Sequence, residues 1–176
     1  MIYFAKTHNN YINFNFKNKL MNLKINDTAP DFKLFNTEKK EISLSDYKGK
    51  NVVILFFPLA FTGTCTTELC HMRDDIANYN SLNAVILGIS IDSLFVLGKF
   101  KEAQNLNFDL LSDFNKVAST AYGCLYEEFI FTMKGVSKRS AFVVDKNGKI
   151  QYEEILEKAT EQPNYENIKA CLSKLK

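Results

Sequence analysis

The chain has 176 residues, of which 46% are apolar and 24% are charged, and these proportions are typical of one soluble globular domain. They exclude a disordered or fibrous protein, and no apolar run approaches the ~18 residues needed to cross a bilayer, so we expect no membrane partner. The formal net charge of +2 comes from four lysines and no acid in residues 1–26, because the rest carries 18 basic residues against all 20 acidic ones. A nearly neutral body argues against a nucleic-acid partner.

Residues 1–20 are predicted to be a leader outside the folded domain. They are rich in Asn and aromatic residues and lack the unbroken apolar stretch of a secretory signal. We expect a disordered leader or an upstream extension; an organelle-targeting presequence is the weaker alternative, because the segment has neither Arg nor Ser. The folded domain is expected over residues 21–176, in the cytoplasm.

The first predicted elements are strands. Residues 32–44 contain short stretches of alternating polar and apolar side chains and lead to a turn at 47–50. Residues 51–57 form a continuous apolar run with β-branched and aromatic side chains, which predicts a strand buried on both faces. Pro58 ends this strand.

A helix follows, because apolar residues recur there at spacings of three and four; these are Leu69, Met72, Ile76 and Tyr79. A second buried strand is predicted at 84–90. The remaining elements before residue 123 are a helix over about 93–104, a short strand at 108–111 and a helix over 116–122.

The end of the chain contains a predicted hairpin and a last helix. Residues 140–144 and 150–155 flank an Asn-Gly pair, which favours a tight turn between antiparallel strands. The last helix has one apolar face, formed by Ile168, Cys171, Leu172 and Leu175. This alternation predicts an α/β fold with a mixed central β-sheet flanked by helices.

Candidate chemistry is concentrated between the first buried strand and the first helix. Cys65 falls in the expected first turn, where free backbone N–H groups and the helix dipole favour a thiolate. Thr62 has a hydroxyl that can orient a small polar substrate, and Pro58 can shield the sulfur from water. The structural alternative is that Thr62 and Thr64 cap the helix, Pro58 only ends the strand and Cys65 is an inert buried thiol.

The motif Pro58-x-x-x-Thr62-x-x-Cys65 resembles the active-site signature of the peroxiredoxins, the alkyl hydroperoxide reductase and thiol-specific antioxidant family. The resemblance extends over most of residues 21–175. It includes the segments 29–32, 57–63, 111–113 and 137–145. It implies a thioredoxin-like fold.

The resemblance also implies roles for individual residues. Cys65 matches the peroxidatic cysteine, Thr62 the threonine that orients the peroxide, and Pro58 the shielding proline. Arg139 matches the arginine that stabilises the thiolate and the transition state, and Glu68 a carboxylate that anchors an arginine. The implied reaction is attack of the thiolate on the O–O bond of hydrogen peroxide or an organic hydroperoxide, giving a sulfenic acid. No cofactor is implied, and the enzyme would act as a monomer or homodimer.

Two subgroups of the family differ in the thiol that recycles Cys65, and the sequence resembles both. Cys70 and the residues after it resemble the bacterioferritin comigratory protein, or peroxiredoxin Q, subgroup, in which a resolving cysteine lies five residues downstream and thioredoxin reduces the disulfide. The loop at 57–63 is more similar to the one-cysteine alkyl hydroperoxide reductase E type, in which an outside thiol resolves the sulfenic acid. Cys124 is predicted to be a core residue, and Cys171 lacks the sequence context of a resolving cysteine.

Two other classes are weighed against the peroxidase. A metal site from Cys65, Cys70 and His71 is disfavoured because it has only three local ligands at an unsuitable spacing. A peroxide-sensing relay that oxidises a partner protein would share the first step and differ only in its acceptor.

Overall fold

The computed structural model describes residues 23–175. The predicted leader at residues 1–20 and the expected domain start at 21 lie outside this part of the chain. The strands are β1 (Lys33–Asn36), β2 (Glu41–Ser43), β3 (Asn51–Phe56), β4 (Ala84–Ser90), β5 (Asp109–Ser112), β6 (Ser140–Val144) and β7 (Ile150–Ile155). The helices are α1 (Gly63–Asp74), α2 (Ile76–Ser81), α3 (Leu94–Ala103), α4 (Val117–Ala121) and α5 (Tyr165–Ser173), with short 3-10 helices η1 (Leu44–Tyr47) and η2 (Ile130–Thr132).

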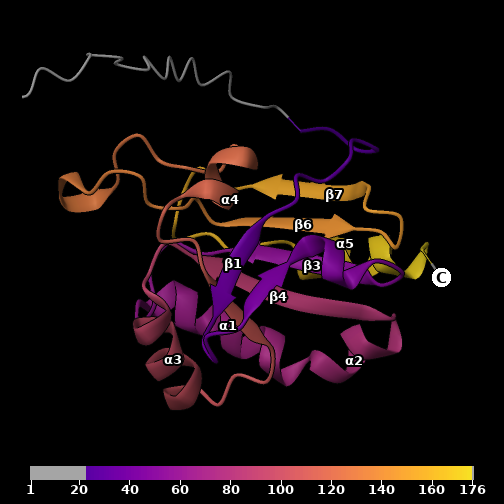
Figure 1. The fold of residues 1–176 in the computed structure, drawn as a ribbon, viewed down its shortest axis with the longest axis horizontal. Helices are drawn as coiled ribbons and strands as arrows, with labels where there is room; N and C mark the ends of the chain where they lie inside the picture. Colours follow the sequence, from indigo (N-terminus) through magenta and orange to yellow (C-terminus); the bar gives the residue numbers. More distant parts are fainter. Residues whose placement is uncertain (1–22, 176) are drawn as a thin grey trace, which may run out of the picture.

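Across the described residues the strands form one mixed sheet in the order β2-β1-β5-β4-β3-β6-β7 (Figure 1). Strand β4 pairs in parallel with β3 and β5, whereas β6 runs antiparallel to β3 and to β7. Every residue of β3 is buried, as its continuous apolar run predicts. The predicted α/β class with a mixed central sheet is confirmed.

Helices cover both faces of this sheet, and the alternating side chains of β3 show how. Val53 and Leu55 pack with residues of α1, α2, α3 and α5. Val52 and Ile54 face the other layer, which contains α4 and the first described segment of the chain. Because a strand directs successive side chains to opposite faces, β3 lies between two cores.

The predicted elements agree with the structure to within a few residues, with one exception. The apolar spacing from residue 69 to 79 predicts one helix, but α1 ends at Asp74 and α2 begins at Ile76. Asp75, between them, has ψ of 6° and its backbone N–H bonds to the carbonyls of His71 and Arg73. The spacing of buried side chains continues across this break, since Met72 of α1 and Tyr79 of α2 are buried in the same core.

Candidate active site

Cys65 lies in the first turn of α1, directly after the loop that leaves β3. Thr62 precedes the helix in an extended conformation, and Gly63 begins it. The Cys65 side chain is 1% exposed. The free N–H groups of this turn and the positive end of the helix dipole favour an anion, so the position suits a thiolate.

Arg139 reaches Cys65 from a distant part of the sequence. Strand β6 pairs antiparallel with β3 so that Ser140 lies opposite Phe56, which brings the preceding Arg139 to the carboxyl end of β3. Its Nη2 lies 3.3 Å from Cys65 Sγ and also donates to the carbonyl of Ala159 at 2.9 Å. This contact places the fixed positive charge of a buried guanidinium at the sulfur.

Glu68 holds this guanidinium from the other side. It lies one turn after Cys65 on the same face of α1, is fully buried, and accepts a hydrogen bond from Arg139 Nη1. Burial raises the pKa of Glu68 to about 7, and the charge of Arg139 opposes that rise. The arginine is thereby fixed between a carboxylate and the Cys65 sulfur.

The loop before α1 is held by side-chain and backbone hydrogen bonds. Thr62 Oγ1 donates to the carbonyl of Leu59 at 2.8 Å, so this side chain does not cap the helix as the structural alternative suggested. The N–H of Ala60 donates to Asp92 Oδ2 at 2.7 Å. Between them Phe61 has φ of 62°, a left-handed conformation that a bulky residue adopts only when its surroundings impose it. Asp92 comes from the loop after β4, and no local sequence pattern predicts its contribution.

One cavity of about 430 Å³ brings the predicted residues together. Pro58, Thr62, Cys65 and Arg139 all line it, whereas Glu68 lies behind Arg139 and does not. The other walls come from two segments that the sequence reasoning missed, within residues 126–130 and 157–160. These segments have no periodic pattern that could have marked them.

Cys70 lies on the same continuous helix as Cys65 but does not line this cavity. Residues five apart on a helix are separated by about 7.5 Å along the axis and about 140° around it, so their Cα atoms are farther apart than the ~7 Å that a disulfide tolerates. Cys65 and Cys70 are both free thiols in the structure. A disulfide between them therefore requires α1 to unwind locally.

The other two cysteines belong to the cores. Cys124 is fully buried, as predicted, and burial raises the pKa of its thiol. Cys171 is half-buried on α5, where burial also raises the pKa of its thiol. Both environments favour the unreactive thiol.

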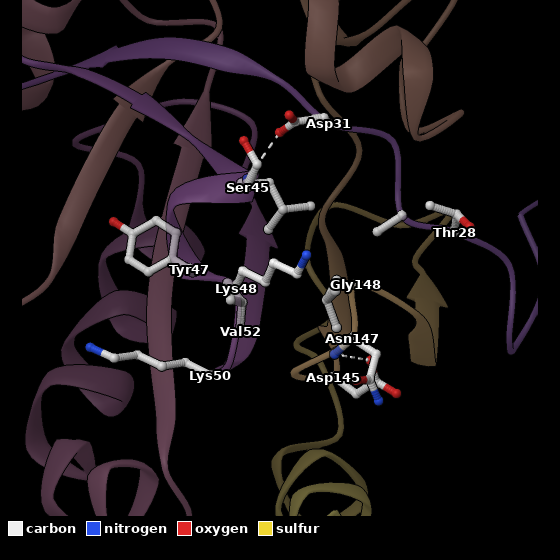
Figure 2. A pocket seen from close by; sticks show the side chains of 13 residues that line it. Thr28, Asp31, Ser45, Tyr47, Lys48, Lys50, Val52, Asp145, Asn147 and Gly148 are labelled. Atoms are coloured by element: carbon white, nitrogen blue, oxygen red, sulfur yellow. Dashed lines mark hydrogen bonds between the residues drawn. The ribbon is translucent and has the colours of Figure 1, made fainter.

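A second cavity, of about 220 Å³, lies at the opposite end of β3 (Figure 2). It is lined by Val52 near the start of β3, by Lys48, and by Asp145 and Gly148 of the β6–β7 turn. Figure 2 shows Lys48 extending toward the segment that carries Gly148. No cysteine lines this cavity, so it offers no nucleophile for thiol chemistry.

Two further findings concern residues 23–175. No group of three or more His, Cys, Asp or Glu side chains there is arranged to hold a metal ion. Within the same range, no helix has the length and apolar composition needed to span a membrane.

The sequence matches one protein family and is similar to individual proteins of two bacteria. The AhpC/TSA family model matches residues 25–153. The chain is 40% identical over 132 residues to peroxiredoxin Bcp of Bacillus subtilis, covering 74% of this chain and 83% of that protein. It is 34% identical over 132 residues to peroxiredoxin Bcp of Escherichia coli, covering 74% and 84%.

Solved structures agree with this similarity. Peroxidoxin BcpB of Mycobacterium tuberculosis superimposes with a TM-score of 0.77 at 28% identity, covering 88% of this chain and 99% of that one. A peroxiredoxin-like protein of Aquifex aeolicus gives a TM-score of 0.79 at 28% identity, covering 87% and 88%. With the cavity around Cys65, these similarities show that the chain belongs to the AhpC/TSA family and is a peroxiredoxin, a thiol-dependent peroxidase with a thioredoxin-like fold.

Proposed function

We propose that Cys65 is the peroxidatic cysteine and that the cavity around it binds hydrogen peroxide or an organic hydroperoxide. The contact between Arg139 Nη2 and Cys65 Sγ carries this proposal, because it places a fixed positive charge at the sulfur inside the cavity. The thiolate attacks one peroxide oxygen, an S–O bond forms and the O–O bond breaks. The leaving hydroxide or alkoxide takes a proton, so the products are a sulfenic acid and water or an alcohol.

The neighbouring residues have distinct roles in this reaction. Arg139 stabilises the negative charge as it moves from sulfur to oxygen. The Thr62 oxygen accepts a hydrogen bond from the bound peroxide, and Pro58, which offers no N–H, keeps water from the sulfur. Glu68 acts through Arg139 by holding the guanidinium in place.

Cys70 resolves the sulfenic acid in this proposal, and thioredoxin or another thiol then reduces the Cys65–Cys70 disulfide. Its position five residues after Cys65 and the similarity to Bcp proteins support this assignment over resolution by an outside thiol. The proposed reaction takes place in the cytoplasm, where a disulfide is transient and catalytic.

Stopped-flow oxidation tests the first step. Cys65→Ser should lose the fast reaction with hydrogen peroxide, because no other cysteine lines the cavity. Cys171→Ser is the matched control and should keep it. Fast peroxide consumption by Cys65→Ser would refute the proposal.

Intact mass after one equivalent of peroxide tests the second step. Loss of two hydrogens from the oxidised wild type supports a Cys65–Cys70 disulfide. Gain of one oxygen without a disulfide refutes resolution by Cys70, while leaving Cys65 as the peroxidatic residue.

A further inference from the structure

The sulfur of Cys70 also lies beside an arginine. Cys70 is half-buried on α1, and its Sγ lies 3.5 Å from Arg73 Nη1 and 3.6 Å from Gln104 Oε1. Arg73, one turn later on the same helix, donates from the same Nη1 to the carbonyl of Gln104 at 2.6 Å. Its Nε donates to Asp74 at 2.8 Å. The guanidinium is therefore held in place while it contacts the sulfur.

These contacts also tie the second half of α1 to a neighbouring segment. Gln104 directly follows α3, and Asn107, shortly before β5, donates from Nδ2 to the carbonyl of Arg73 at 3.2 Å. Arg73 is thus bound through its side chain and its backbone to the connection between α3 and β5. The hydroxyls of Thr66 and Thr67 instead bond only to carbonyls at the start of α1, so they add no tie to another element.

The two halves of α1 are held by different arginines: Cys65 in the first turn contacts Arg139, whereas Cys70 in the second half contacts Arg73. If residues 63–67 unwind while the helix from Glu68 onward stays formed, Cys65 is three residues from the first fixed Cα, that of Glu68. An extended chain spans about 3.3–3.6 Å per residue, which lets Cys65 approach Cys70 within disulfide distance. Cys70 does not have to leave its contacts with Arg73 before the sulfurs meet.

We propose that Arg73 is the positioning residue of the resolution step: it holds Cys70 beside a positive charge and anchors that half of α1, so that the first turn unwinds and Cys65 moves to a stationary Cys70. This inference rests on the proposed function of Cys70 as the resolving cysteine. In the step itself the Cys70 thiolate attacks the Cys65 sulfur, an S–S bond forms and the S–O bond breaks. Hydroxide leaves and takes a proton to become water. The guanidinium acts by holding the Cys70 sulfur in place for this attack.

The test follows both steps separately in wild type, Arg73→Gln and Arg73→Lys. Stopped flow measures oxidation of Cys65, and rapid quench with mass analysis measures disulfide formation, each at neutral pH. Lys99→Gln is the matched control, because it removes one positive charge from an exposed ion pair on α3.

Arg73→Gln should form the disulfide about tenfold more slowly at neutral pH, as expected for loss of one charge-assisted hydrogen bond. Arg73→Lys should recover much of the rate, and Lys99→Gln should match wild type. The oxidation of Cys65 should stay within about twofold in every variant, since Arg73 does not touch the cavity.

Three outcomes would overturn the inference. A wild-type rate of disulfide formation in Arg73→Gln would refute the role of Arg73 while leaving Cys70 as the resolving cysteine. Equal slowing of both steps would show a general structural defect instead. A wild type that forms sulfenic acid but no disulfide would overturn the assignment of Cys70, and the role of Arg73 with it.

Discussion

Cys65 and Cys70 lie on one helix, and each sulfur contacts an arginine, but the two surroundings are built differently. Arg139 comes from the sheet, 74 residues along the chain from Cys65, and its side chain is 1% exposed. Arg73 comes from the same helix as Cys70, and its side chain is 27% exposed. The first environment depends on the pairing of β6 with β3, whereas the second joins two residues of α1 to the connection between α3 and β5. A helix that unwinds at one end can therefore lose the first and keep the second.

The largest effect is expected at Arg139. Arg139→Gln should lower the second-order rate constant for Cys65 oxidation by about 10²–10³, as for loss of one donor that stabilises charge in the transition state. Stopped-flow oxidation by hydrogen peroxide measures it, with Arg73→Gln as the comparison variant. If both variants lowered this rate equally, the two arginines would not act on separate steps.

A smaller effect is expected at Thr62, which lines the cavity of Cys65 and is absent from the surroundings of Cys70. Thr62→Val should lower the oxidation rate constant about 10- to 100-fold, because the peroxide loses its hydrogen-bond acceptor. Thr62→Ser keeps the hydroxyl and should stay close to wild type in the same assay. An equally active Thr62→Val would show that the hydroxyl does not orient the substrate.

The smallest effect is expected on the free energy of unfolding. It concerns Glu68 and Asp74, the acidic partners of Arg139 and Arg73. Burial raises the pKa of Glu68 to about 7, above its ordinary value of 4.5, so the folded protein holds this proton more tightly than the unfolded chain. The resulting contribution to stability is fully present below about pH 4.5 and is lost as pH rises through about 7. Relative to Glu68→Gln, the wild type should lose on the order of 1–3 kcal/mol between these limits.

Urea unfolding at several pH values measures this difference. Asp74→Asn is the control, because the Asp74 side chain beside Arg73 is 68% exposed. The difference in unfolding free energy between wild type and Asp74→Asn should not fall between pH 4.5 and 7. A flat profile for Glu68→Gln would mean that burial does not control the protonation of this carboxyl.

The sequence was sufficient to predict most elements, because their signals are local. The buried run of β3 and the Asn-Gly turn between β6 and β7 are examples. The break at Asp75 was missed because the spacing of buried side chains continues across it.

The candidate site was predictable only in part. The position of Cys65 after a strand and at a helix start follows from local patterns, whereas Arg139 was named through a family resemblance. Spacing could not supply it, because the antiparallel pairing of β6 with β3 is what brings it to the sulfur. Asp92 was missed for a similar reason, since its hydrogen bond to Ala60 crosses between two loops.

The hydrogen bond from Thr62 to Leu59 has a consequence for the choice of oxidant. A hydroxyl has a single proton, and Thr62 Oγ1 already donates it to the Leu59 carbonyl. Toward the cavity it therefore presents only lone pairs, and its ligand must bring a proton of its own. Hydrogen peroxide and monoalkyl hydroperoxides carry that O–H group, whereas a dialkyl peroxide has the same O–O bond and no proton to offer. The loop thus favours substrates that have an O–H group on the terminal oxygen as well as the weak O–O bond.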